Sequence, residues 1–237
     1  MKWWIGSSVA VLIVGGLVVL GFLREYNSKA AFDPAFFESS ISNFEKADRE
    51  EPPQPGAIVF VGSSSILFWG QLNEHMAPLP VIRRGFGGSH MLHVLHNVHR
   101  IVTPYEPSAV VVYAGDNDLA AGSGKTAENV VAGYVEFVNE VHSQVPEARI
   151  YFISIKPSIL RWDRWSEMSL ANQRIEALSR EDRRLGYFDI ATPMLGANGE
   201  PREELFYVDG LHLNAEGYRV WTDVIRPNLV NDGVGRS

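Results

Sequence analysis

The sequence predicts an α/β fold, a three-layer α/β/α sandwich around a five-stranded parallel sheet. Five short apolar runs alternate with longer amphipathic stretches, and these stretches are long enough for the crossover helices that parallel strands require. Of the 237 residues, 46% are hydrophobic and 21% are charged, which is typical of a globular domain with an appendage. The repeating order of strand and helix places helices on both faces of one sheet.

The predicted strands are continuous apolar runs, as expected for strands that are buried on both faces. They are predicted at residues 57–61, 79–82, 109–113, 150–155 and 187–190. The amphipathic helices are predicted at residues 91–102, 126–145, 167–185 and 214–231. In such a fold, polar residues that follow the carboxyl ends of the strands converge on one crevice, and a functional site is expected there.

An uncharged, apolar segment precedes the predicted domain. No charged side chain occurs from Trp3 to Leu23, and at about 1.5 Å per residue this run is long enough to cross a hydrocarbon core of about 30 Å. It predicts a transmembrane anchor within residues 1–24, although the small residues Ser28 and Ala30 also fit a cleaved signal peptide. We therefore expect a single-pass membrane protein, and we favour an orientation with the folded domain on the extracytoplasmic side.

The remaining division of the chain follows from turn signals. Residues 25–55 are predicted to form a linker, because Asp33-Pro34 and the proline-rich stretch 52–55 are typical of turns and extended chain. One short helix within residues 36–46 can pack on the domain. The folded domain is predicted to cover residues 56–232.

Composition excludes several classes of function. The net charge of -7 leaves no basic stripe to neutralise phosphates, so nucleic acid is not expected as a partner. The absence of cysteine excludes a thiolate nucleophile, a disulfide and a cysteine-based zinc site. Four histidines recur every third residue from His90 to His99, but this spacing drifts around a helix axis and does not gather the imidazoles. We expect neither a metal nor a cofactor.

Serines follow the first predicted strand, in the sequence Gly62-Ser63-Ser64-Ser65. A glycine followed by serines at a strand-to-helix turn can expose a hydroxyl above the sheet, with backbone N–H groups free to face a developing oxyanion. Serine is also an ordinary turn and helix N-cap residue. This segment by itself leaves both interpretations open.

Glycines and an asparagine follow the next two strands. Three glycines within residues 84–90 indicate a backbone that approaches another group closely, which suits an N–H donor as well as a tight turn. Asn117 lies between two aspartates after the third strand. Its side-chain NH₂ can donate to an oxyanion, whereas the charged carboxylates of its neighbours cannot. A loop N-cap is the alternative role for Asn117.

The strongest local pattern is the pair Asp209 and His212. An aspartate three residues before a histidine can fold back so that its carboxylate accepts the Nδ1–H, which leaves Nε2 to take a proton from a serine. Asn214 then caps the last predicted helix and holds the turn in place. A histidine in an ordinary surface turn is the alternative.

Together these four segments resemble the SGNH (GDSL-like) hydrolase family, which is named for its Ser, Gly, Asn and His blocks. The blocks contain Ser64, Gly88, Asn117 and His212, in the family's order, and the resemblance spans about residues 56–230. The first block usually has aspartate where this chain has Ser63, as in the branch that resembles platelet-activating-factor acetylhydrolase subunits. The resemblance implies a flavodoxin-like arrangement of the predicted sheet.

The resemblance also implies a serine esterase. Ser64 is the implied nucleophile and His212 the base, while Asp209 orients the imidazole. The backbone N–H groups of Ser64 and Gly88, with the Asn117 side chain, form the implied oxyanion hole.

Two further residues are candidates for substrate contacts. His90 adjoins the glycine-rich turn, and Trp162 follows the fourth strand on the side where ligands bind, although packing is the alternative for both. Ser63 and Ser65 compete locally with Ser64. The expected substrates are small-molecule, acetyl-type short acyl esters, either small lipids or O-acetylated carbohydrates. A non-catalytic binding or scaffold protein on the same fold and an acyltransferase with the same three residues are the alternative functions.

Overall fold

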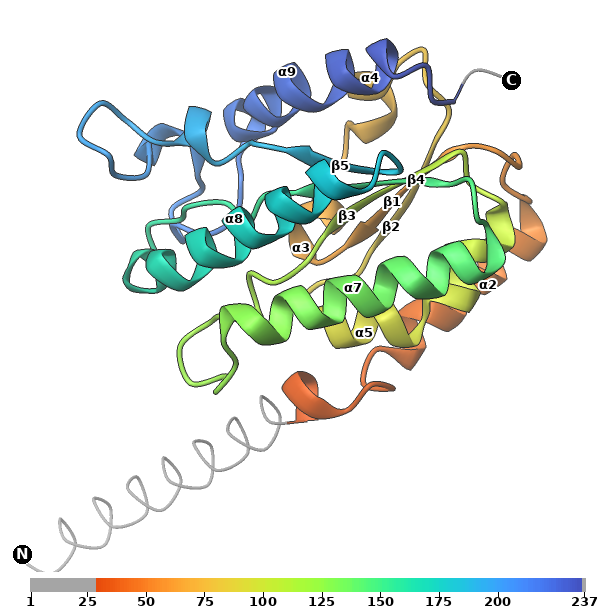
Figure 1. Ribbon diagram of the computed structural model, residues 1–237, viewed down its shortest axis with the longest axis horizontal. Helices are drawn as coiled ribbons and strands as arrows, with labels where there is room; N and C mark the ends of the chain where they lie inside the picture. The colour runs from red at the N-terminus through yellow and green to blue at the C-terminus, as the bar shows by residue number, and fades with distance from the viewer. Residues whose placement is uncertain (1–28, 236–237) are drawn as a thin grey trace, which may run out of the picture.

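The computed structural model describes residues 29–235, which form a parallel sheet between two layers of helices (Figure 1). The sheet has five strands in the order β2-β1-β3-β4-β5, as a doubly wound α/β fold requires. The strands are β1 (Ile58–Gly62), β2 (Val81–Gly85), β3 (Ala109–Tyr113), β4 (Arg149–Ile153) and β5 (Leu185–Phe188). Gly62 of β1 is in register with Gly85 of β2 and Tyr113 of β3, so these strands end at the same edge of the sheet.

Alternate residues of each central strand enter two separate hydrophobic cores. Val59 and Val61 of β1 belong to one core, and Ile58 and Phe60 belong to the other. The first core is covered by α2 (Glu38–Glu50), α5 (Met91–His96), α6 (Val98–Ile101), α7 (Ala127–Gln144) and α8 (Trp165–Glu181). The second is covered by α3 (Ser64–Leu67), α4 (Leu72–Met76) and α9 (Ala215–Asn231). Short 3₁₀ helices are η1 (Thr103–Tyr105), η2 (Trp162–Arg164), η3 (Thr192–Met194) and η4 (Glu203–Leu205).

The helices differ from the sequence prediction in several places. The helix predicted at 167–185 begins at Trp165 and ends at Glu181, and Leu185 is the first residue of β5. The helix predicted at 91–102 is divided at Asn97, whose side-chain NH₂ donates to the backbone oxygen of His93 and competes with the helical hydrogen bonds. The short helices α3 and α4 were not predicted, because four or five residues do not establish a helical period.

The described part of the predicted linker packs on the domain. Ile41 of α2 is fully buried, and Arg100 of α6 donates to Glu38 and Glu45 of α2 over 2.6 Å. Upstream of α2, the Phe37 ring contacts Phe86 at 5.5 Å between ring centroids. Residues from Phe37 onward are therefore part of the packed structure. The domain boundaries predicted at residues 24 and 25 lie outside the described residues.

The structure corrects one part of the predicted fold. No helix within residues 29–235 is long and apolar enough to cross a membrane. The physical reason is that the long helices are amphipathic, with one face buried in the sandwich and charged residues on the other, as in α7. The apolar segment 3–23, from which the anchor was predicted, lies outside the described residues. Three predictions are therefore wrong for the part of the chain that the structure describes: the transmembrane helix, the membrane localisation and the extracytoplasmic domain.

Candidate active site

Ser64 lies at the turn from β1 into α3, where the backbone leaves the sheet. The turn requires glycine at position 62, because its φ is +148° and an added Cβ would lie 2.0 Å from the backbone oxygen of Tyr113. Ser64 is the first residue of α3, and the first N–H groups of a helix have no acceptor within the helix. The strand-to-helix turn thus presents both the Ser64 hydroxyl and backbone donors at the carboxyl edge of the sheet.

Asp209 and His212 form a tight turn directly before α9. Asp209 Oδ2 lies 2.6 Å from His212 Nδ1, and Oδ1 accepts the backbone N–H groups of Leu211 and His212 at 2.9 and 3.0 Å. Asn214 caps α9 by accepting the N–H groups of residues 216 and 217, as the sequence predicted. Desolvation raises the pKa of Asp209, but these hydrogen bonds outweigh it and lower that pKa to about 2. The carboxylate is therefore ionised and orients the imidazole.

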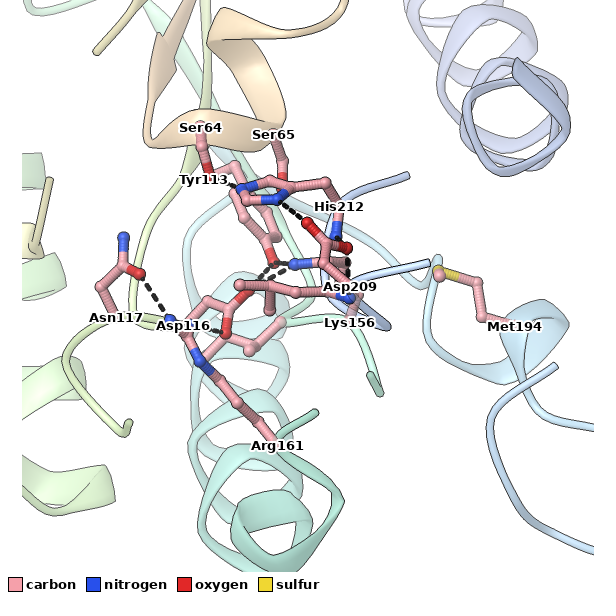
Figure 2. Close-up of polar contacts among 12 residues, drawn as sticks. Ser64, Ser65, Tyr113, Asp116, Asn117, Lys156, Arg161, Met194, Asp209 and His212 are labelled. Atoms are coloured by element: carbon pink, nitrogen blue, oxygen red, sulfur yellow. Dashed lines mark hydrogen bonds and ion pairs between the residues drawn. The ribbon is translucent and has the colours of Figure 1, made fainter. Parts of the chain in front are cut away.

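The Ser64 hydroxyl and the His212 imidazole meet although 148 positions separate them in the sequence, with Ser64 Oγ 3.1 Å from His212 Nε2 (Figure 2). Because an ionised carboxylate only accepts hydrogen bonds, Nδ1 carries the imidazole proton and Nε2 accepts from Ser64. The competing serines Ser63 and Ser65 are each 2% exposed. Of the three serines, the one predicted from the sequence is the one that contacts His212.

The glycine-rich turn and Asn117 lie on the other side of Ser64. A Cβ added to Gly87 would lie 4.0 Å from the Cβ of Ser64, and Gly88 has a positive φ of 84°. Asn117 donates from Nδ2 to the backbone oxygen of Ser89 at 3.0 Å. Gly88 and Asn117 line one pocket of about 690 Å³. The structure therefore brings the predicted residues Gly88 and Asn117 into one pocket, and Gly87 of the same turn adjoins Ser64.

A buried ionic cluster lies next to Asn117, and it was not predicted from the sequence. Asp116 accepts from Lys156 and Arg161, and the Tyr113 hydroxyl donates to it at 3.0 Å (Figure 2). Desolvation raises the pKa of Asp116, but the two cations hold it well below its ordinary value. Burial lowers the pKa of Lys156. The available signal was Lys156 itself, a single cation within the otherwise uncharged stretch from residue 150 to 160.

Arg161 fixes which way the Asn117 amide faces. Its Nη2 donates to Asn117 Oδ1 at 3.0 Å, so the amide oxygen is turned to the ionic cluster and the NH₂ group away from it (Figure 2). An asparagine NH₂ carries two hydrogens, and only one is used by the Ser89 oxygen. The second N–H remains for a group that enters the site.

The two predicted substrate contacts have different positions. His90 lines the same pocket as Gly88 and Asn117, and its Nδ1 lies 3.0 Å from Nζ of Lys125. Trp162, in η2, stacks on Trp165 with 5.8 Å between ring centroids and is absent from the lining of that pocket. Within residues 29–235, no group of three or more histidine or acidic side chains has a geometry that could hold a metal ion.

Residues 61–220 match the family described as GDSL-like Lipase/Acylhydrolase. The chain belongs to the GDSL-like lipase/acylhydrolase family. The matched region extends from the end of β1 into α9, so it contains Ser64, Asn117 and His212. Membership of this family makes the chain a carboxylic ester hydrolase. None of the curated proteins matches the chain.

Solved structures share the fold of this GDSL-type hydrolase at low sequence identity. A Streptococcus pneumonia protein, provisionally described as a platelet activating factor, is 16% identical with a TM-score of 0.75, over 90% of this chain and 99% of that chain. A GDSL-like lipase from Bacteroides thetaiotaomicron is 20% identical with a TM-score of 0.69, over 81% of this chain and 99% of that chain. At these identities the likeness concerns the fold alone.

Proposed function

We propose that this hydrolase cleaves short acyl esters of small lipids or O-acetylated carbohydrates through Ser64, His212 and Asp209. The observation that carries the proposal is the continuous hydrogen-bonded path from Ser64 Oγ through the imidazole to the Asp209 carboxylate, over 3.1 and 2.6 Å. A serine hydroxyl is a weak nucleophile by itself, and a neighbouring base whose tautomer is fixed activates it.

In the first half of the reaction, Ser64 Oγ attacks the ester carbonyl carbon and its proton passes to His212 Nε2. The carbonyl oxygen becomes an oxyanion, which the N–H groups of Ser64 and Gly88 and the Asn117 NH₂ stabilise. The tetrahedral intermediate collapses when the bond to the alcohol oxygen breaks, and that oxygen takes the proton from His212. The acyl group remains on Ser64.

In the second half, water replaces the alcohol. His212 takes a proton from the water as its oxygen attacks the acyl carbon, and the same proton then returns to Ser64 Oγ when the acid leaves. No cofactor is required, because both steps are proton transfers and acyl substitutions. Asp209 stabilises the imidazolium in each half.

Hydrolysis of p-nitrophenyl acetate by the purified full chain tests the proposal against its alternatives. We expect turnover by the wild-type protein, with a loss of more than about 10³-fold in Ser64→Ala and nearly full activity in Ser63→Ala. Equal rates for wild type and Ser64→Ala would favour a binding or scaffold protein. An acyltransferase would transfer the acetyl group to an added alcohol or sugar in preference to water.

A further inference from the structure

Exposed apolar side chains gather around the His212 side of the site. Within residues 29–235, eight large apolar side chains are exposed, and five of them lie in three short segments close in sequence or in space to His212. The other three are Phe32, Val135 and Leu67, and the Leu67 side chain lies beside Gly87. We call the five residues the apolar rim, which consists of Phe68, Ile159, Leu160, Tyr207 and Val208.

Contacts of the three segments hold the rim beside the imidazole. The Phe68 ring packs edge-on against the His212 ring, with 5.1 Å between centroids. Leu160 donates its N–H to the backbone oxygen of Gly210, inside the turn that carries His212, at 3.0 Å. Tyr207 donates its N–H to the backbone oxygen of His212 at 2.8 Å. The rim is therefore fastened to the catalytic turn, and its side chains are not scattered surface residues.

The position of the rim indicates which part of an ester substrate it can contact. His212 Nε2 gives its proton to the leaving alcohol oxygen, so the alcohol must lie within hydrogen-bond reach of this ring. The carbonyl oxygen would face the proposed donors Gly88 and Asn117, which line a pocket with Arg161. The lining of that pocket also includes Phe32, Phe36 and Phe37 but no residue of the apolar rim. An alcohol group that leaves the reaction centre on the His212 side therefore meets apolar side chains.

We propose that the apolar rim binds the alcohol part of the substrate, and that this substrate is an acyl ester of an apolar, lipid-like alcohol. This inference rests on the proposed function and selects one of its two substrate classes. Packing the methylene groups of the alcohol against the rim removes them from water, which is favourable. A carbohydrate would lose water from its hydroxyls, and aliphatic side chains such as Leu160 and Val208 offer no hydrogen bond in exchange.

A series of acetate esters with different alcohols tests this inference. Every ester leaves the same acetyl group on Ser64, so differences in kcat/KM report the step in which the alcohol is bound and released. Three proteins are compared: wild type, the double variant Leu160→Ser with Val208→Ser, and Val135→Ser. The substrates are ethyl, butyl and hexyl acetate and 6-O-acetylglucose, which keeps its other hydroxyls free. Acid release is measured at concentrations where the esters are monomeric. Leu160 is 60% exposed and Val208 fully exposed, so the fold should tolerate both changes. Val135, 38% exposed on α7, is the matched control.

For wild type and Val135→Ser, we expect kcat/KM to rise from ethyl to hexyl acetate by up to about fourfold per methylene. The rim double variant should lose at least about fivefold of the hexyl-to-ethyl ratio, with an unchanged unfolding midpoint. A flat series in the wild type, an unchanged ratio in the double variant, or a higher kcat/KM for 6-O-acetylglucose than for hexyl acetate would overturn the inference. These outcomes leave the proposed function intact, whereas the absence of Ser64-dependent hydrolysis of every ester would end the proposed function itself.

Discussion

Asp209 and His212 lie on an exposed turn, whereas Asp116, Lys156 and Arg161 on the other side of Asn117 form a buried cluster. The side chains of His212 and Asp209 are 27% and 45% exposed, against 1% and 4% for Lys156 and Asp116. The turn is held by hydrogen bonds within four residues, and the cluster by ion pairs between segments that are far apart in the sequence. Changes in the turn should therefore affect chemistry, and changes in the cluster should affect stability as well.

The largest expected effect is the loss of activity in His212→Gln. Because the imidazole accepts the Ser64 proton and returns it, we expect kcat to fall by about 10³- to 10⁴-fold. The free energy of unfolding should change by less than about 1 kcal/mol, because the side chain is partly exposed. Assays with p-nitrophenyl acetate and urea unfolding measure the two effects. A destabilised but active variant would reverse the contrast between the turn and the cluster.

The next effect concerns the stability of the ionic cluster. Lys156→Met leaves the buried Asp116 with Arg161 as its remaining cation and should lower the free energy of unfolding by about 3 kcal/mol. The control is Arg180→Met, which breaks an exposed pair with Glu176 on α8 and should change stability by less than about 0.5 kcal/mol. Urea unfolding of both variants gives the comparison. Equal effects would show that burial does not distinguish the two pairs.

Asn117→Ala should reduce kcat without a large change in KM. Loss of one oxyanion donor typically lowers kcat by about 10²- to 10³-fold, because the hydrogen bond strengthens as negative charge develops. The effect should be smaller than that of His212→Gln measured in the same assay. An increase in KM at constant kcat would instead indicate a role in binding the ground state.

Arg161→Gln should lower kcat by about tenfold, because the Asn117 amide loses the partner that fixes its orientation. Arg161 is a positioning residue in this account, so its effect must depend on Asn117. In an Asn117→Ala background, Arg161→Gln should have little further effect on kcat. Additive losses in the double variant would mean that Arg161 acts on the substrate independently.

The smallest effect is the pH dependence that Asp209 gives to stability. Its pKa of about 2 in the folded protein is below its ordinary value, so the carboxylate stabilises the folded state above the unfolded-state pKa of about 4, and this contribution is lost as the pH falls toward 2. The difference in stability between wild type and Asp209→Asn should be constant above about pH 5 and shrink below pH 4. Urea unfolding across this range measures it, and a difference that grows on acidification would contradict the sign.

The difference between the Asp209–His212 turn and the buried ionic cluster also explains how much of the site could be predicted from the sequence. Asp209 and His212 are three residues apart, so their hydrogen bond could be predicted from local spacing. The Gly62 turn gave a weaker local signal for Ser64, which pointed to the nucleophile only together with the other segments. The partners of Lys156 are determined by which strands adjoin in the sheet, and no local pattern contains that information. The three central strands were predicted to within two residues because continuous apolar runs report burial directly. The edge strands β2 and β5 are only partly buried, and they share just two residues each with the predicted ranges 79–82 and 187–190. The division of the helix at Asn97 depends on one side-chain hydrogen bond and was not predicted.

The account depends most on the meeting of Ser64 and His212, and covalent labelling tests it most directly. Wild type, Ser64→Ala and His212→Gln are treated with a fluorophosphonate that reacts with activated serines, and the adduct is located by peptide mass spectrometry. We predict one adduct, on Ser64, formed at least about 100-fold more slowly in His212→Gln. An adduct on Ser63 or Ser65, or equally fast labelling without the imidazole, would contradict the account.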